Sequence, residues 1–301
     1  MEIAVLSDIH GNYVALERCM ELCRERGIET YIFLGDYAGE LAYPERTMEM
    51  LYEIDKKYNC YFVRGNKEDY WKNYYDRGES GWKEYDSTTG SLYYTYYHLS
   101  KQSMNFYDKL LVKQKVKIGN FPEMTICHGS PDRTNEKMLP NNEKTFENML
   151  KNDTNVILCG HTHIQQIIDH EGRYVLNGGA VGVSLFAEGK AQFMILSDET
   201  NKDDDSLCWK QMDGLGMKYA LISLSYEAEQ VIQDLYEAGL DKYAPCWCKV
   251  TQYLLRKGDI SHGLVLNRAM ELCQNAEGKC IWPDIPEKYW QQAVEEMLVN
   301  N

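Results

Sequence analysis

Short apolar runs alternate with amphipathic helical patterns through the first part of the chain. One helical pattern follows His10, with Gly27 placed to end it, and a second follows Pro44. The apolar runs have the length and the β-branched or aromatic content of buried strands, and they cover residues 3–6, 31–34, 61–63, 125–127 and 156–159. The start of the chain is therefore predicted to be a βαβαβ unit.

The remainder of the chain changes from strand pairs to helices. Short strand patterns with Gly-rich turns cover residues 164–168, 174–176, 191–196, 207–212 and 219–225. The acidic tract 201–205 between two of them is expected to be a solvated hairpin loop. Helical patterns follow over residues 226–238, 247–257, 262–274 and 286–299. We predict an α/β catalytic domain over residues 1–240 and a C-terminal helical appendage over 241–301.

Metal-binding side chains come directly after each of the five apolar runs. They are Asp8 and His10, Asp36, Asn66, His128, and His161 with His163. At such strand ends they converge on one edge of the fold. A pair of divalent cations needs about seven O and N ligands and one shared carboxylate, which this set supplies. A lone histidine of this kind is more often a core residue, but four of the seven histidines lie at strand ends.

The order of these motifs resembles the calcineurin-like metallophosphoesterase superfamily. The resemblance covers about residues 1–200 and rests on Asp8-x-His10, Gly35-Asp36, Gly65-Asn66, His128 and Gly160-His161-x-His163. It implies a four-layer αββα sandwich of two mixed sheets flanked by helices. It also implies a dinuclear centre in which Asp36 bridges the two ions. One ion would be held by Asp8, His10, Asp36 and His163, and the other by Asp36, Asn66, His128 and His161.

The donor set restricts the metals. Imidazole with carboxylate suits Mn, Fe, Co, Ni or Zn better than Mg or Ca, and we favour Mn or Fe. A hydroxide that bridges two such ions is ready for in-line attack on phosphorus, so no protein nucleophile is required. Asn66 and His128 are counted as catalytic as well as ligating residues.

One motif departs from the family pattern. The family usually has a histidine after the asparagine, beside the scissile phosphate, whereas this chain has Lys67 in Gly65-Asn66-Lys67-Glu68. Lys67 is a candidate catalytic residue that faces the phosphate and stabilises charge on the leaving oxygen. The alternative is that Lys67 pairs with Glu68 or Asp69 at the start of a helix.

A segment rich in aromatic residues follows the Asn66 motif. We predict a cap insertion over about residues 70–110, and residues 70–97 contain Tyr70, Trp71, Tyr74, Tyr75, Trp82, Tyr85, Tyr93, Tyr94, Tyr96 and Tyr97. Such rings can stack on a nucleotide base or an aryl group above the metals. The alternative, which we prefer, is that they pack cap helices onto the sandwich.

The composition limits the classes of molecule that the protein is expected to bind. A net charge of −14 over 301 residues disfavours an extended nucleic-acid surface, although bound cations can still attract a small phosphorylated substrate. We expect neither a membrane span nor a signal peptide, and we do not expect the ten cysteines to form a disulfide framework. These features predict a cytoplasmic protein.

Several weaker features carry no predicted chemistry. The lysines of residues 113–117 alternate with apolar residues, which a half-exposed strand explains better than an anion site does. His98, His170 and His262 have no ligand partner in the sequence.

The sequence predicts a metal-dependent hydrolase of a small phosphodiester or phosphomonoester. A protein phosphatase is disfavoured, because Gly39-Glu40-Leu41 stands where those relatives carry Asp-Arg-Gly. The alternative is a catalytically weak or inactive scaffold of the same fold that binds a partner protein. Loss of the usual histidine favours the scaffold, and retention of every ligand favours the enzyme.

Overall fold

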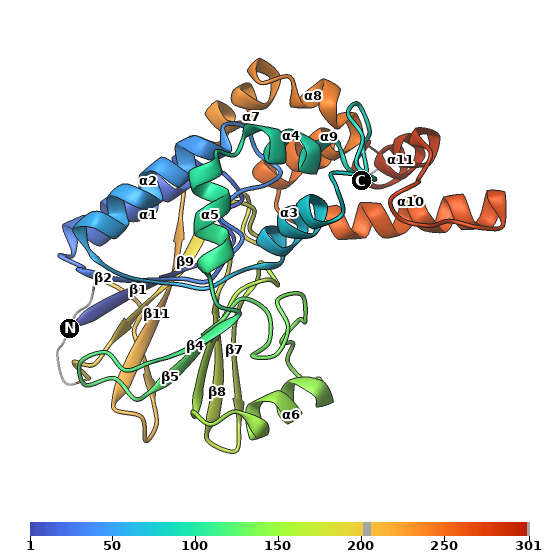
Figure 1. Cartoon of the computed structure of the whole chain (residues 1–301). Helices are drawn as coiled ribbons and strands as arrows, with labels where there is room; N and C mark the ends of the chain where they lie inside the picture. The colour runs from blue at the N-terminus through green and yellow to red at the C-terminus, as the bar shows by residue number, and fades with distance from the viewer. Residues whose placement is uncertain (201–205, 300–301) are drawn as a thin grey trace.

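Two β-sheets form the centre of the protein (Figure 1). The computed structural model describes residues 1–200 and 206–299. The predicted hairpin loop at 201–205 lies outside these residues. The first sheet has the order β10-β11-β9-β1-β2-β3. Its strands are β1 (Glu2–Leu6), β2 (Thr30–Phe33), β3 (Asn59–Phe62), β9 (Ala191–Ser197), β10 (Lys210–Met212) and β11 (Met217–Leu224). Strands β1, β2 and β3 are parallel, and β9 runs antiparallel to β1 and to β11.

The second sheet has the order β4-β5-β6-β8-β7. Its strands are β4 (Lys113–Val116), β5 (Met124–Cys127), β6 (Val156–Cys159), β7 (Gln165–His170) and β8 (Arg173–Gly178). Strands β5, β6 and β8 are parallel, whereas β4 and β7 pair antiparallel at the two edges. Both sheets are thus mixed, which confirms the predicted fold class.

Strand β1 is buried on both faces. Ile3 and Val5 face a core that includes Leu158 and Leu176 of the second sheet, while Ala4 and Leu6 face the core that contains helix α1 (Tyr13–Glu25). This explains why β1 has a continuous apolar run rather than an alternating pattern. Burial of each large aliphatic side chain contributes about 1.5–3 kcal/mol, so the two cores fix the ends of the central strands firmly.

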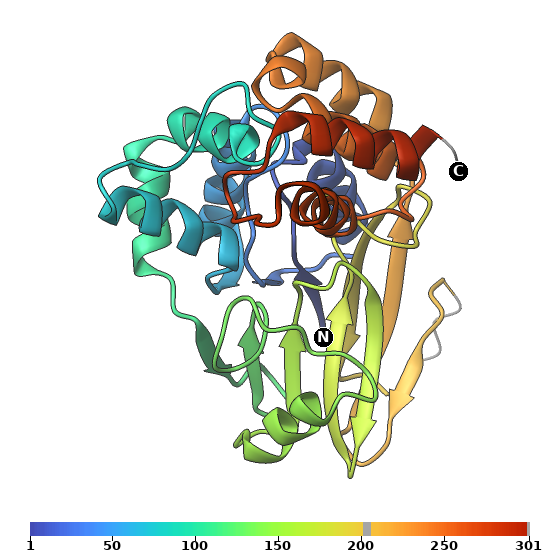
Figure 2. The same cartoon turned by 90° about the vertical axis from the view of Figure 1, so that its right-hand side faces the viewer.

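Helices cover the outer faces and one end of the sandwich (Figures 1 and 2). Helix α1 packs with α2 (Pro44–Lys57), and α6 (Glu143–Lys151) packs on β8 of the second sheet. The predicted cap insertion forms α3 (Asn66–Asp76), α4 (Gly90–His98) and α5 (Lys101–Lys109). No helix among the described residues is long and apolar enough to cross a membrane.

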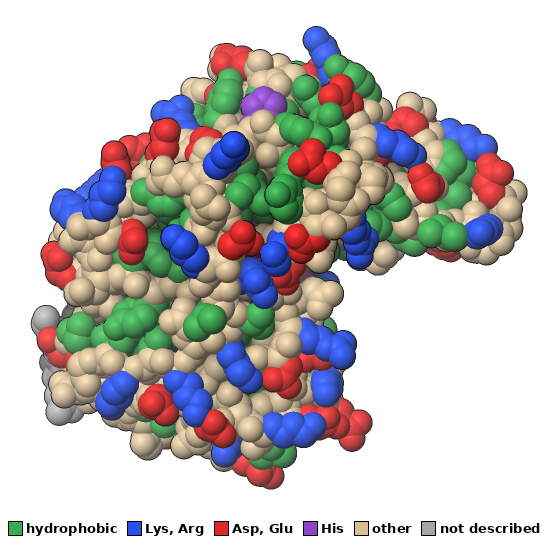
Figure 3. Space-filling view, viewed as in Figure 1, with side chains coloured by type: hydrophobic (Ala, Val, Ile, Leu, Met, Phe, Trp, Pro, Cys, Tyr) green, Lys and Arg blue, Asp and Glu red, His purple; other side chains and the backbone are tan. Residues whose placement is uncertain are grey.

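The C-terminal segment is helical, as predicted. It contains α7 (Ala228–Glu237), α8 (Leu240–Tyr243), α9 (Pro245–Arg256), α10 (His262–Glu277), α11 (Glu287–Val294) and the π-helix η1 (Glu295–Val299). Leu254 and Leu255 of α9 share a buried cluster with Leu41 and Val183, so helices beyond residue 240 pack directly against the loops of the sandwich. Helix α10 projects sideways, and Figure 3 shows the molecule hollowed beneath it.

Candidate metal centre

The loops that carry the candidate ligands have an unusual backbone. Asp8, His10, Asp36, His161 and His163 all have φ between 54° and 65°. Non-glycine residues rarely adopt this left-handed conformation, and it persists only where the surroundings enforce it. Hydrogen bonds between loops do so here, because the Asp8 N–H donates to the Gly35 carbonyl at 3.1 Å and the His10 N–H donates to the Asp36 carbonyl at 2.9 Å.

Two glycines allow these loops to approach each other. A Cβ at Gly65 would collide with the Asp36 carboxylate, and a Cβ at Gly160 would collide with the Ser7 hydroxyl and crowd Asp8. Steric hindrance therefore explains why the Gly-Asn and Gly-His motifs begin with glycine.

Asp8, His10 and His163 form one compact group of candidate ligands. Their ligand atoms lie within 4.8 Å of one another. Asp8 Oδ1 is 3.2 Å from His163 Nε2 and 3.7 Å from His10 Nε2. This oxygen is fully buried and has no hydrogen-bond partner in the described part of the chain. A buried carboxylate oxygen that lies beside two imidazole nitrogens and has no geometric hydrogen bond fits a cation site.

Asp8 and Asp36 form a second such group with His128. Asn66 Oδ1 also lies 3.1 Å from His128 Nε2. Asp36 connects the groups, since its Oδ1 is 3.4 Å from His128 Nε2 and its Oδ2 is 3.7 Å from His10 Nε2. The two oxygens of one carboxylate thus lie one toward each group, an arrangement that a bridging ligand can have.

His161 lies beside these groups rather than inside them. Its ring centroid is 5.2 Å from that of His128, and its backbone N–H donates to Asp8 Oδ2 at 2.9 Å. Burial, assisted by His128, lowers the pKa of His161 to about 4. The imidazole is therefore neutral near pH 7, the form that binds metals. Its role as a ligand stays a prediction.

The other ring nitrogens of three histidines have fixed partners. His128 Nδ1 donates to the Leu34 carbonyl at 2.6 Å, and His163 Nδ1 donates to the Val183 carbonyl at 2.8 Å. A carbonyl accepts only, so Nδ1 carries the proton and, in the neutral ring, Nε2 presents its lone pair to the centre. His10 Nδ1 lies 2.6 Å from Glu40 Oε2. Glu40 is not among the site residues predicted from the sequence.

The buried carboxylates and imidazoles of the site shift one another's pKa values. Burial alone would lower the pKa of His10, but Glu40 and Asp8 outweigh it and raise the pKa to about 10. Burial would raise the pKa of Asp8, but His163 and His128 outweigh it and hold that pKa well below its usual range. The buried carboxylates thus create a strongly negative potential that attracts protons and cations alike.

Lys67 lines the cavity at the candidate centre and does not pair with a neighbour on its own helix. It is 8% exposed, and its ammonium forms an ion pair with Glu40 Oε1. Burial would lower the pKa of Lys67, but Glu40 and Asp36 raise it, so the side chain stays charged. The alternative prediction, in which Lys67 pairs with Glu68 or Asp69, is therefore wrong. Glu68 instead accepts the backbone N–H groups of Gly65, Asp36 and Tyr37, and Asp69 accepts from the Thr134 hydroxyl at 2.7 Å.

A cavity of about 250 Å³ opens onto this group. Besides site residues and Lys67, its lining includes Trp247 and Leu254 of α9 and Ser261, His262 and Gly263 at the start of α10. His262 was expected to have no role, and no feature of the sequence signals that α10 reaches the site.

The aromatic segment does not line this cavity. Tyr74 and Trp82 stack at 3.9 Å, with Tyr96 edge-on to Tyr74 at 4.9 Å, and Trp71 is fully buried. These contacts agree with the preferred interpretation that the rings pack the cap helices.

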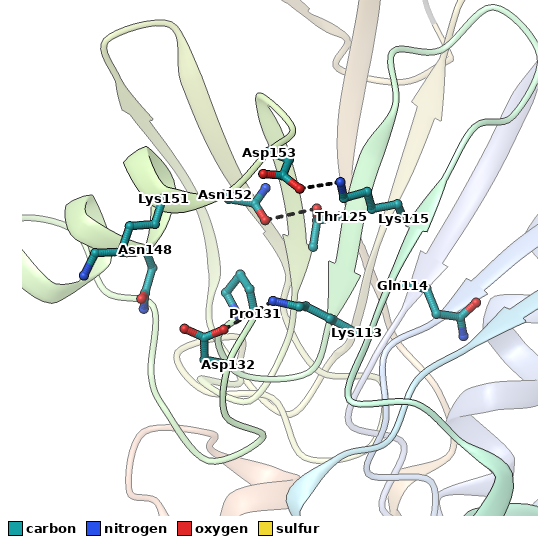
Figure 4. A pocket seen from close by; sticks show the side chains of 10 residues that line it. All are labelled: Lys113, Gln114, Lys115, Thr125, Pro131, Asp132, Asn148, Lys151, Asn152 and Asp153. Carbon is teal, nitrogen blue, oxygen red and sulfur yellow. Dashed lines mark hydrogen bonds and ion pairs between the residues drawn. The ribbon is translucent and has the colours of Figure 1, made fainter.

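A second cavity lies on the second sheet, and its lining residues include none of the candidate ligands (Figure 4). Its lysines are neutralised, since Lys113 pairs with Asp132 at 3.2 Å and Lys115 pairs with Asp153 at 2.5 Å. Lys113 and Lys115 are exposed on β4, as the half-exposed strand predicted. The cavity has no unpaired cation among its described lining residues and does not indicate an anion site.

Comparison with known proteins places these features in a family. Residues 1–201 match the model of the calcineurin-like phosphoesterase superfamily domain. The uncharacterized protein MJ0912 of Methanocaldococcus jannaschii is 26% identical over 223 residues, which cover 66% of this chain and 84% of that protein.

Two solved structures share the fold over most of their length. A metallophosphoesterase from Sphaerobacter thermophilus matches with a TM-score of 0.63 and 20% identity, covering 86% of this chain and 99% of that chain. The hypothetical protein PH1004 from Pyrococcus horikoshii OT3 matches with a TM-score of 0.67 and 22% identity over the same shares.

Proposed function

Because the chain belongs to the calcineurin-like phosphoesterase superfamily and is a hydrolase of phosphoric esters, we propose that it cleaves a small phosphodiester or phosphomonoester with two divalent transition-metal ions. Asp8, His10, Asp36 and His163 would hold one ion, and Asp36, Asn66, His128 and His161 the other. Mn or Fe is favoured by the mixture of imidazole and carboxylate. When bound, the ions would supply a hydroxide nucleophile at neutral pH and neutralise the phosphoryl oxygens.

The observation that carries this proposal is the orientation of Asp36. Its two oxygens lie 3.4 Å from His128 Nε2 and 3.7 Å from His10 Nε2, one toward each group. A single carboxylate that serves two cations also relieves their mutual repulsion. Asp8 Oδ1 supports the same reading, since it is buried without a hydrogen-bond partner among the described residues, and such a carboxylate oxygen is costly to bury without a cation nearby.

The chain's own residues would orient the centre and the substrate. Leu34 and Val183 fix the Nε2 lone pairs of His128 and His163, and Glu40 does the same for His10. Lys67 would act as a permanent positive charge beside the phosphate. Its raised pKa makes it a poor proton donor at neutral pH, so it would stabilise a departing oxygen without protonating it.

The scaffold alternative has less support. A protein that binds only a partner has no need for Asp8 and Asp36 buried face to face with three imidazoles, an arrangement that costs stability unless it is compensated. A cytoplasmic location is part of the proposal and is supported by ten free cysteines.

Metal analysis and turnover test the proposal together. The purified protein should bind close to two equivalents of Mn²⁺ and hydrolyse bis(p-nitrophenyl) phosphate or p-nitrophenyl phosphate. Chelation should remove the activity, and added Mn²⁺ should restore it. Full metal loading without turnover of either ester would favour the scaffold.

A further inference from the structure

The cavity over the candidate centre has two unlike ends. One end includes candidate ligands and Lys67, and the other includes residues of α9 and α10 that lie outside the matched region 1–201. Lys137, Thr162 and Leu185 also line the cavity. In an in-line displacement the leaving group departs opposite the attacking oxygen. A phosphoryl group held by the ligand end must therefore direct one substituent toward the helical end.

Trp247 and His262 give the helical end a flat surface. Their rings stack with centroids 4.3 Å apart and an interplanar angle of 19°. Trp290 of α11 packs edge-on against Trp247 at 5.8 Å, which fixes the indole from behind. Two stacked rings supply apolar area that loses little entropy when a ligand binds, because each ring has only two side-chain torsions.

The hydrogen bonds of His262 determine which ring nitrogen can meet a ligand. Thr251 Oγ1 donates its only proton to the Trp247 carbonyl at 2.9 Å. The same oxygen lies 2.8 Å from His262 Nε2 and must therefore accept a hydrogen bond from it. His262 thus carries its proton on Nε2, and in the neutral ring Nδ1 is an acceptor. The described residues offer Nδ1 no hydrogen-bond partner.

We propose that Trp247 and His262 form the leaving-group subsite of this hydrolase, and that the subsite takes a compact alcohol with an apolar part and a hydroxyl or amine that donates to His262 Nδ1. The inference rests on the proposed function. The cavity volume of about 250 Å³ lies below the ~300–1,000 Å³ of pockets for drug-sized ligands, so the substituent must be small.

Binding of stable phosphonates to the Mn²⁺-loaded protein tests the apolar part of the subsite. Calorimetry would compare methylphosphonate with phenylphosphonate, which adds a flat ring. Trp247→Ala should weaken phenylphosphonate binding by about 5- to 20-fold and leave methylphosphonate unchanged. Trp282→Ala is the matched control, since Trp282 belongs to the same C-terminal segment but does not line this cavity. Trp247→Phe keeps the packing and should show a smaller loss if the Ala variant does not fold.

A second pair of ligands tests the hydrogen bond. Wild type should bind 2-hydroxyethylphosphonate about 2- to 12-fold more tightly than ethylphosphonate, the range that one net hydrogen bond contributes. His262→Gln should bind the two ligands equally. His98→Gln, which removes a histidine stacked on Tyr94 elsewhere, should keep it.

The outcomes separate the two proposals. If methylphosphonate does not bind the Mn²⁺-loaded protein, the proposed metal and phosphate site itself is wrong. If methylphosphonate binds and Trp247→Ala weakens both phosphonates equally or neither, the centre stands and the leaving-group subsite is overturned. An unchanged preference in His262→Gln overturns the hydrogen-bonding role of Nδ1.

Discussion

Glu40 holds His10 through a 2.6 Å hydrogen bond between its Oε2 and the imidazole Nδ1. Its second oxygen pairs with the Lys67 ammonium, so one buried carboxylate positions both a candidate ligand and a lysine. Such outer contacts tune a metal site almost as strongly as the ligands do.

Glu40→Gln tests this connection. The amide keeps the shape of the side chain but loses the charge that orients His10 and neutralises Lys67. We expect Mn²⁺ affinity or kcat/KM to fall by about 10- to 100-fold. Glu143→Gln, an exposed change at the start of α6, is the control and should have no effect. Equal metal affinity and kcat/KM in both variants would contradict a positioning role for Glu40.

Asp36→Asn should be the most damaging single change among the candidate ligands. It removes a carboxylate whose two oxygens lie one toward His128 Nε2 and one toward His10 Nε2. The oxygen that accepts the Lys67 backbone N–H at 2.9 Å is kept. We expect kcat/KM to fall by more than about 100-fold, beyond the loss from Asn66→Ala. Elemental analysis checks the cause. Two fully occupied ions in an active Asp36→Asn protein would disprove the bridging assignment.

The role of Lys67 is measurable with a series of leaving groups. If Lys67 only stabilises charge, the enzyme should be fast on nitrophenyl esters and slow on alkyl esters. Lys67→His should then raise the rate mainly on alkyl esters, by up to the ~10²–10⁴-fold of general acid catalysis. Lys67→Ala should lower the rate most on alkyl esters, because most charge develops on their departing oxygen. Parallel plots of log rate against leaving-group pKa for the three proteins would show that Lys67 takes no part in departure of the leaving group.

Tyr74 distinguishes packing of the cap from substrate binding. Its ring is 4% exposed and stacks on Trp82 at 3.9 Å. Tyr74→Ala should lower the free energy of unfolding by about 3–5 kcal/mol, the cost of removing a buried aromatic ring. Urea denaturation measures this, and the KM for p-nitrophenyl phosphate should not change. Tyr75→Ala, at an exposed ring, is the control. A raised KM with unchanged stability would instead place the cap over the substrate.

Burial of His262 should make the protein sensitive to acid. Burial lowers the pKa of His262 from 6.5 to about 3 in the folded protein. Between these values the unfolded chain binds a proton that the folded protein does not, so stability is full above pH 6.5 and falls as the pH drops toward 3. Between pH 7 and pH 5 the wild type should lose about 2 kcal/mol more than His262→Gln does. Urea denaturation at both pH values, with His98→Gln as control, gives the comparison. Identical pH slopes would contradict a neutral buried His262.

The convergence of the ligand motifs was predictable because it depends on the geometry of strands. Asp8 and Asp36 follow neighbouring parallel strands, and His128 and His161 follow another such pair, so the βαβ order alone brings each pair to one edge. Strand lengths were less predictable. The pattern at 207–212 yields only β10 (Lys210–Met212), because the backbone turns between Leu207 and Trp209.

The partner of Lys67 was not predictable from its neighbours. Residues one and two positions apart on a helix do not face each other, which is why Glu68 and Asp69 were wrong partners. Glu40 lies in an irregular loop, and the only hint is an acidic residue four positions after Asp36. For His262, the N-cap Ser261 predicts where α10 begins but not where it docks, because docking depends on distant packing.

The cavity residues contributed by α9 and α10 are synthesised after the candidate ligands. Every candidate ligand has been synthesised by His163, whereas His262 follows 99 residues later. At ~5–20 residues per second, a ribosome needs roughly 5–20 s to make that interval. During this time a nascent chain can possess the complete set of ligands without the surface that selects the alcohol. Discrimination between esters would thus be acquired only after the ligand set has been made.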